Sequence, residues 1–263
     1  MTWGASMDTV KLTYKIYVLP ILTFGQELLI CASASNCKKL DVIQNQALRI
    51  ITGGIKSTPI KAMEMFAGIL PLTYLREIAS MKLYERIVRT PNSIWKNFKT
   101  VENRLKSKIS FVHRVQSIYR KYNLSLDEKV RRFCFYKKFS RLKRFSEIKR
   151  SITKTVQKKV EIEHQNESIG KTWQNINQTS IRSTNRNIYV ANFRKLTDHD
   201  LLYKHLTRIG VKQSSTCPMC NISEQTSSHL LTCPSLRNFR ENIEDLDEEE
   251  FFAKIYWHVR GQQ

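Results

Sequence analysis

The chain is short of acidic residues, and this shortage is the main feature of its composition. Its 263 residues include 44 Lys and Arg against 23 Asp and Glu, a formal net charge of +21. Such a charge predicts association with a polyanion or an anionic surface. Hydrophobic residues still make up 41% of the chain, which excludes disorder from end to end. The length allows one large domain or two small ones.

The sequence also lacks an apolar run long enough to span a membrane. Its most apolar stretch, residues 16–25, is interrupted by Pro20, whereas a spanning helix needs about 20 mostly apolar residues. We therefore expect a buried helix there and no membrane partner. A secretory signal, with Lys11 and Lys15 ahead of the run, is the alternative interpretation.

Cysteines are too few for a disulfide scaffold, with six in the whole chain. Such sparse use favours a reduced, intracellular protein of the nucleus or cytoplasm. We interpret Cys31, Cys37 and Cys134 as ordinary core or surface residues, because no partner stands at metal-ligand spacing from them.

The other three cysteines and one histidine form a metal-ligand pattern, C-x2-C-x8-H-x3-C. Cys217 and Cys220 lie on a Cys-Pro-Met-Cys turn that can aim two sulfurs at one point. His229 and Cys233 are four residues apart, so on a helix they share one face. Three thiolates and one imidazole fill a tetrahedral zinc shell and leave no open position. The pattern therefore predicts a structural zinc knuckle.

Apolar spacing predicts helices in residues 1–98, and a mainly α fold for the whole chain. One helix is expected over 39–52, ended by Gly53 and Gly54. A second is expected from Thr58 as N-cap to Gly68. A third is expected from Pro71 to Pro91. The apolar face of this third helix is Leu72, Leu75, Ala79, Leu83 and Ile87.

Residues 99–170 form a basic connector that we expect to be helical. Residues 101–160 alone hold 19 Lys and Arg against 4 Asp and Glu. Basic side chains there would contact phosphates without sequence preference, and Phe133, Tyr136 or Phe139 would stack on unpaired bases. The alternative is a solvated helix surface whose aromatic residues form a core. The candidate nucleic-acid-binding residues are Arg131, Arg132, Lys137, Lys138, Arg141, Lys143 and Arg144.

The remainder of the chain, residues 171–263, is expected to be a small helical region with the zinc knuckle. The polar stretch 161–187 predicts a loop with a boundary near residue 170. Apolar periodicity predicts one helix over 191–209, ended by Gly210. We interpret the acidic stretch 241–250 as a solvated helix face.

Two stretches carry a family resemblance. The first contains Leu19-Pro20-Ile21-Leu22-Thr23-Phe24-Gly25 and Gln46-Ala47-Leu48-Arg49-Ile50-Ile51-Thr52-Gly53-Gly54. It resembles the region after the catalytic palm in the reverse transcriptases of jockey-like non-LTR retrotransposons. The second contains Phe193-Arg194-Lys195-Leu196-Thr197-Asp198 and continues through the cysteine–histidine pattern. It resembles the tail after the RNase H domain of the same polyproteins, in which glycine usually stands at the position of Asp198.

The resemblance implies a thumb-like helical region, a truncated RNase H region as the basic connector, and a tail with a zinc knuckle. The family's catalytic motifs are not found, because the chain has no Asp-Asp pair and no Asp-Gly-Ser opening between residues 99 and 172. The expected function is non-catalytic, sequence-nonspecific binding of RNA or DNA, with structural Zn²⁺.

Two alternatives remain open. One is retained activity as an RNA-directed DNA polymerase or an RNase H-type nuclease, with Mg²⁺ held by unrecognised carboxylates and His199 or Asp200 as a general base. The other is a protein-interaction module, in which the helices of residues 39–89 present an apolar groove. Exposed apolar helix faces would also favour self-association.

Overall fold

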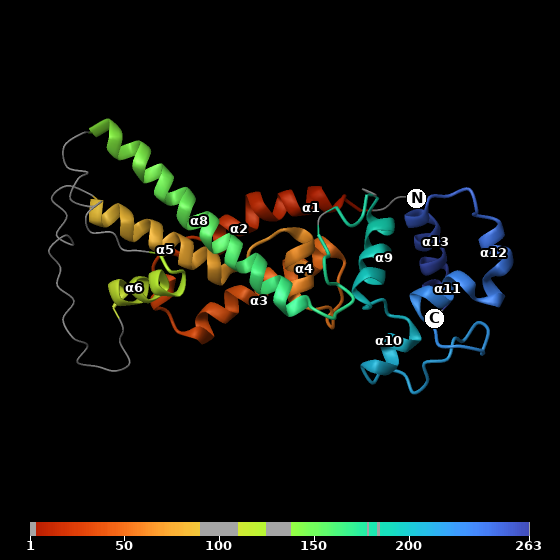
Figure 1. Ribbon diagram of the computed structural model, residues 1–263. Helices are drawn as coiled ribbons and strands as arrows, with labels where there is room; N and C mark the ends of the chain where they lie inside the picture. The colour runs from red at the N-terminus through yellow and green to blue at the C-terminus, as the bar shows by residue number, and fades with distance from the viewer. Residues whose placement is uncertain (1–3, 90–109, 125–137, 178, 183–184, 263) are drawn as a thin grey trace. The chain divides into compact units, whose positions relative to one another are not determined.

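The structure is a computed structural model, and it describes residues 4–89, 110–124, 138–177, 179–182 and 185–262. The side chains of Arg89 and of residues 138–144 lie outside this description. The chain is mainly helical, with 67% helix, and its described residues form no strand. The prediction of a mainly α fold is therefore confirmed (Figure 1).

The chain divides into two compact units, each assembled from separate stretches of sequence. Unit 1 contains residues 1–17, 45–69 and 165–263, and unit 2 contains residues 18–44 and 70–164. The three regions expected from the sequence, 1–98, 99–170 and 171–263, are continuous stretches. These regions follow from the resemblance to a retrotransposon polyprotein, and their boundaries stay a prediction.

Unit 1 is built from short helices that pack around α9 and α13. Its core includes Ala191 of α9, Leu230 beside the metal-ligand pattern, and Phe252 and Tyr256 of α13, all at most 2% exposed. Asp247 caps α13 by accepting the Glu250 N–H at 2.9 Å. The acidic first turn of α13 then meets the positive end of the helix dipole. The helices of unit 1 are α1 (Met7–Thr13), the end of α3 (Ala34–Thr52), α4 (Ile60–Ala67), α9 (Arg186–Thr197), α10 (Tyr203–Arg208), α11 (Ser227–Thr232), η4 (Pro234–Leu236), α12 (Arg237–Glu241) and α13 (Glu248–Gly261).

Residues 45–69 dock directly on α9 within unit 1. Phe66 of α4 stacks on Phe193 of α9 with ring centroids 4.6 Å apart. Arg194 Nε donates to the Gly53 carbonyl at 3.0 Å. Arg186 Nη1 donates to the Ile51 carbonyl at 2.5 Å, at the C-terminal end of α3. Stretches more than 100 residues apart in sequence therefore share one core.

Gly53 is required where α3 ends against α9. Its φ is +71°, in the left-handed region that favours glycine. A Cβ at this position would lie 2.7 Å from Val190 Cγ1, and such an approach forces a neighbour to move. The predicted end of the helix at Gly53 is therefore confirmed, and close packing adds a second reason for glycine there.

Unit 2 is a helical bundle in which α5, α6 and α8 share one core. Ile78, Met81 and Tyr84 of α5 meet Val115 and Tyr119 of α6 and the buried side of α8. The α8 side of this core consists of Ile152, Val156 and Val160, which are spaced by four residues and at most 3% exposed. The helices of unit 2 are α2 (Leu19–Leu22), η2 (Leu29–Cys31), the start of α3, α5 (Leu72–Arg89), α6 (Phe111–Lys121) and α8 (Lys138–Ser168), and the π-helix η1 (Tyr14–Val18) joins the two units in sequence.

The third predicted helix forms as α5, but it buries a different face from the one expected. Ile78, Met81 and Tyr84 are buried in the core. Of the expected face, Leu75, Ala79 and Leu83 are only partly buried. The apolar residues of α5 occupy more than one face, so spacing alone did not identify the face that meets α6 and α8.

Three further local predictions are corrected by the structure. Thr58 does not cap α4, since the N-cap is Pro59 and the Thr58 hydroxyl accepts the Ile55 N–H at 3.0 Å. The expected loop at 161–187 begins later, because α8 continues to Ser168. The expected helix over 191–209 is two helices, α9 and α10, separated where Asp198 and Leu201 take φ of +54° and +60°. No helix among the described residues has both the length and the apolar character to cross a membrane.

Candidate metal centre and basic helix face

The metal-ligand pattern lies in unit 1, on a turn and a short helix. Cys217 and Cys220 belong to the turn, which is held by the Asn221 N–H to Cys217 carbonyl bond and the Cys217 N–H to Ser223 carbonyl bond, both 2.8 Å. His229 lies in the first turn of α11, where its N–H donates to the Thr226 hydroxyl at 3.0 Å. Cys233 ends that helix. The predicted turn and helical spacing are both present.

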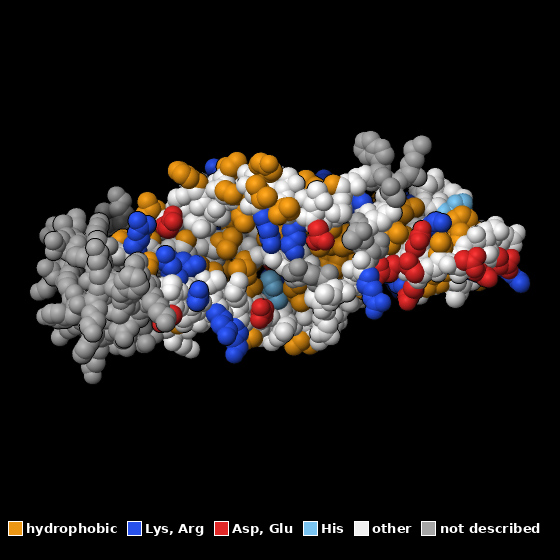
Figure 2. Space-filling view, turned by 90° about the horizontal axis from the view of Figure 1, so that it is seen from above, with side chains coloured by type: hydrophobic (Ala, Val, Ile, Leu, Met, Phe, Trp, Pro, Cys, Tyr) orange, Lys and Arg blue, Asp and Glu red, His pale blue; other side chains and the backbone are white. Residues whose placement is uncertain are grey.

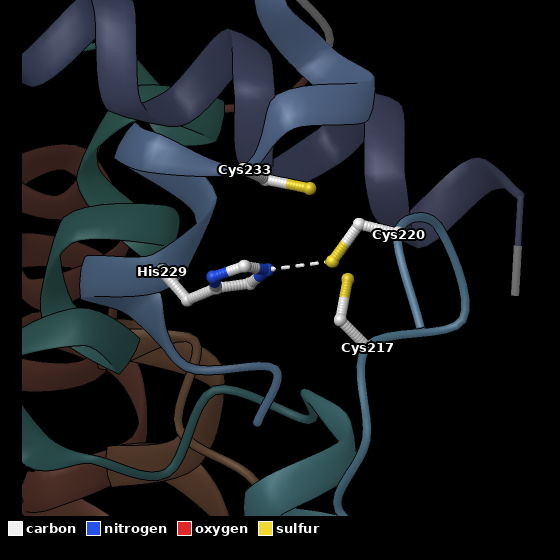
Figure 3. Close-up of side chains that lie close together, drawn as sticks. All are labelled: Cys217, Cys220, His229 and Cys233. Atoms are coloured by element: carbon white, nitrogen blue, oxygen red, sulfur yellow. Dashed lines mark hydrogen bonds between the residues drawn. The ribbon is translucent and has the colours of Figure 1, made fainter. Parts of the chain in front are cut away.

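The four side chains converge on one point (Figure 3). Their sulfur and nitrogen ligand atoms all lie within 4.8 Å of one another, and the His229 Nε2 to Cys220 Sγ distance is 3.4 Å. Tetrahedral zinc, with Zn–S bonds of about 2.3 Å, holds its sulfurs about 3.8 Å apart. Inward movements of about 1 Å would therefore complete the shell. The cluster could hold a metal ion such as zinc.

The electrostatics of the cluster differ between its two sides. The backbone N–H groups of Ile222 and Ser223, with the His229 ring, lower the pKa of the Cys220 thiol to about 6. Cys233 is fully buried in the core of unit 1, and this burial raises the pKa of its thiol to about 11. A divalent cation would favour the thiolate of both residues, because a coordinating thiol is deprotonated.

The cysteines outside the pattern are not brought to the cluster. Cys31 is exposed and Cys37 is partly buried, and both are free thiols. Cys37 Sγ lies 3.5 Å from the Leu29 carbonyl oxygen. Cys134 lies outside the described residues.

All seven residues of the predicted nucleic-acid-binding set fall where side chains are not described. Arg131, Arg132 and Lys137 lie outside the described residues, as do Phe133 and Tyr136. Lys138, Arg141, Lys143 and Arg144 belong to α8 by backbone, and their side chains lie outside the description, as does that of Phe139. The role assigned to these residues stays a prediction.

The described part of α8 has a basic face that lies within the basic stretch 101–160 but outside the seven named candidates. Arg150, Lys154 and Lys158, called the basic face below, are all exposed and spaced by four residues. They lie opposite the buried residues Ile152 and Val156, and span about 12 Å along the helix. In the described part of the chain, no ion pair or hydrogen bond involves their side chains. Lys and Arg side chains are visible over the stretch of α8 in Figure 2.

The sequence contained a signal for this face. Residues 148, 152, 156 and 160 are apolar at four-residue spacing, and residues 150, 154 and 158 are basic with the same spacing but half a turn away. This is the pattern of an amphipathic helix with one charged side. The seven named candidates came from residues 131–144, where charge is dense, and not from this later stretch of the helix.

His199 and Asp200, the candidates for a general base, make hydrogen bonds within unit 1. Asp200 is 2% exposed, and its carboxylate accepts the Leu202 N–H at 3.1 Å and the Ser227 hydroxyl at 2.7 Å. His199 Nδ1 lies 3.1 Å from Ser57 Oγ. Both side chains thus hold the junction between α9 and α10.

Comparisons with protein-family models, with curated proteins and with solved structures found no match for this chain. What the metal cluster and the basic face do is therefore inferred from their own geometry and charge.

Proposed function

We propose that the protein is a non-catalytic, sequence-nonspecific nucleic-acid-binding protein, a remnant of a retrotransposon reverse transcriptase/RNase H polyprotein. The basic face of α8 carries this proposal. Its three cations are exposed and have no partner among the described residues, in contrast to Lys204 and Arg237, which pair with Glu224 and Glu241. A row of unpaired cations on a rigid helix is suited to a row of phosphates, from which it releases counterions.

We further propose that the cluster of Cys217, Cys220, His229 and Cys233 holds a structural Zn²⁺. Three sulfurs and one imidazole nitrogen suit zinc and leave no open coordination position for a water. Cys217 and Cys233 are fully buried in the core of unit 1 beside Leu230. The ion would tie the 217–220 turn to α11, and its binding free energy would stabilise unit 1.

A salt titration tests the nucleic-acid proposal. We expect single-stranded RNA to bind the full chain with an affinity that falls steeply as salt rises. In the variant Arg150→Gln/Lys154→Gln/Lys158→Gln, the slope of log K against log salt should become shallower by about 2, because each phosphate contact to a single strand contributes about 0.7.

The matched control removes the same charge where the cations are paired. Lys204→Gln/Arg237→Gln/Lys254→Gln also lowers the net charge by three, and each residue forms an ion pair on unit 1. Its slope should equal that of the wild-type protein. Equal slopes for both triple variants would mean that binding follows net charge and not the basic face, and salt-independent or absent binding would overturn the proposal.

Catalytic activity would contradict the proposal that the protein is non-catalytic. Several acidic side chains are engaged in structural contacts, since Asp41 pairs with Arg76 and Glu77 with Lys121. Template-directed primer extension and cleavage of an RNA–DNA hybrid, each with Mg²⁺, are the direct measurements. Activity that disappears when one carboxylate is neutralised would replace the proposal.

A second candidate function, self-association, has one observation in its favour. Ile21, Phe24 and Leu28 of unit 2 are 76%, 88% and 63% exposed, and exposed apolar side chains so close in sequence are unusual on a monomer. Sedimentation analysis of the wild-type protein and of Phe24→Glu measures this directly. A monomeric wild-type protein at high concentration would remove this candidate.

A further inference from the structure

Unit 2 contains a pocket of about 440 Å³ whose rim is basic and whose floor is apolar. Leu75, Ile78 and Leu83 of α5 form the floor together with Ala79. This floor includes much of the apolar face that the sequence predicts for α5 and that the core leaves partly exposed. The volume is within the range of small-ligand pockets, about 300–1,000 Å³.

Three cations line this pocket from two helices. Lys82 and Arg86 are one turn apart on α5, and Lys149 comes from α8. Among the described residues that line the pocket, Glu27 supplies the only carboxylate. The segment that carries it is anchored to α5, because the Ser80 hydroxyl donates to the Glu27 carbonyl at 2.8 Å. The described lining therefore carries more positive than negative charge.

Lys82 is the most informative of the three cations. Partial burial lowers its pKa, and the positive charge of Lys149 lowers it further, with no opposing acidic group. Two like charges brought together at a partly desolvated site repel each other. A bound anion would offset this repulsion.

A nucleotide matches this lining in two respects. Its phosphate is an anion suited to the three cations, and its base is a flat surface suited to the apolar side chains. The side-chain oxygen of Gln26, another residue of the lining, is buried and has no hydrogen-bond partner in the described structure.

We propose that this pocket, rimmed by Lys82, Arg86 and Lys149, binds one nucleotide of a single strand, with its phosphate at the cations and its base over Leu75, Ile78 and Leu83. This inference rests on the proposed nucleic-acid binding and makes it more specific. A base can lie over these apolar side chains only when it is unpaired and unstacked, so single strands bind better than duplexes of equal length.

The test compares two charge-matched double variants of the full chain. The probes are a fluorescent oligouridylate and a duplex of the same length. In Lys82→Gln/Lys149→Gln, affinity for the single strand falls about tenfold at physiological salt, and the melting temperature stays equal or rises because the repelling pair is gone. Lys38→Gln/Lys39→Gln loses the same charge from exposed positions of α3 and changes affinity by less than about twofold.

A third variant tests the apolar side chains of the pocket independently of its cations. Ala79→Leu fills the floor and leaves all three cations in place. It weakens single-strand binding several-fold with an unchanged salt slope, because an apolar contact is lost and no phosphate contact is lost. It leaves duplex binding unchanged.

The outcomes distinguish this inference from the function on which it rests. If the wild-type protein binds the single strand and Lys82→Gln/Lys149→Gln binds it equally well, the pocket inference is wrong and the proposed function stands. If the wild-type protein binds no strand, titration with AMP and with inorganic phosphate decides the rest. If AMP binds and this binding is lost in the double variant, the pocket is assigned to a free nucleotide. If neither AMP nor inorganic phosphate binds, the pocket inference is overturned.

Discussion

The arginines of unit 1 and the cations of the basic face in unit 2 differ in what they contact. In unit 1, arginines bond to groups of the same unit. Arg186 donates to the Ile51 carbonyl at the C-terminal end of α3, and Arg208 donates to the Asp198 carboxylate. Arg194 donates to the Gly53 carbonyl and to the Tyr256 hydroxyl. In unit 2, Arg150, Lys154 and Lys158 have no such partner among the described residues. Lys82 and Lys149 line the same pocket.

This difference shows that net charge alone does not locate a binding surface. A cation that donates to a backbone carbonyl has already exchanged its water for the protein, and a polyanion gains little from it. An unpaired cation on a helix keeps its charge available for phosphate. Part of the net charge of +21 is therefore engaged in structural contacts, and another part, which includes the basic face of unit 2, is available to ligands.

Metal removal gives the largest expected effect, and we expect it to act on unit 1. Structural zinc contributes on the order of 10 kcal/mol to folding in zinc-finger peptides, as much as the whole stability of many domains. Elemental analysis should find one equivalent of zinc. Chelation, or Cys217→Ser, should abolish or strongly lower the thermal transition of unit 1.

Cys31→Ser is the matched control for this prediction. Cys31 is an exposed free thiol, so its replacement should change neither the zinc content nor the melting temperature. Less than about half an equivalent of zinc in the wild-type protein, or a thermal transition that a chelator does not move, would count against the metal centre.

The contact between residues 45–69 and α9 predicts the next largest effect. Gly53→Ala combines left-handed strain of about 1–2 kcal/mol with overlap against Val190. We expect the free energy of unfolding to fall by more than about 3 kcal/mol, measured by urea denaturation.

Gly170→Ala isolates the packing part of this loss. Gly170 has φ +72°, almost the same as Gly53, and nothing lies within 4 Å of an added Cβ. It should therefore lose only about 1–2 kcal/mol. Adding Val190→Ala to Gly53→Ala should recover part of the difference, and equal losses for the two glycine variants would show that residues 45–69 do not pack closely on α9.

Local sequence signals predicted part of this fold and much of the candidate site. Gly53 and Gly68 end helices where expected, because positive φ is a property of the residue itself. The cysteine–histidine spacing predicted which four side chains converge, because a turn and one helical turn bring them together locally. Both signals depend only on neighbouring residues.

Longer-range contacts decided the features that the sequence did not reveal. No glycine or proline marks the break between α9 and α10. The break is held by the Tyr256 hydroxyl, which donates to the Asp200 carbonyl at 2.6 Å, and by Arg260, which donates to the Leu201 carbonyl at 3.2 Å. Both donors lie on α13, more than fifty residues away. Likewise, burial of His164 and Ser168 accompanies the continuation of α8 through a polar stretch.

Acid sensitivity is the smallest effect that the comparison predicts, and it concerns a row of hydrogen bonds in unit 1. Arg208 can only donate, so His205 Nδ1, 2.7 Å from it, accepts. His205 Nε2 therefore carries the proton and donates to Ser57 Oγ at 3.0 Å. The Ser57 hydroxyl in turn donates to His199 Nδ1. Protonation of either imidazole would break this row.

The direction of the pH effect follows from the depressed pKa of His199. Burial, then the charges of His205 and Arg208, lower its pKa from 6.5 to about 4, against the opposing charge of Asp198. Between these two values the unfolded chain binds more protons than the folded one, so stability falls as the pH falls from 6.5 toward 4. His199→Gln should lose less stability over the same window in urea denaturation, and zinc release by acid is common to both proteins. Parallel pH profiles for the two proteins would show that His199 titrates freely, and that unit 1 does not depend on a neutral imidazole beside its arginines.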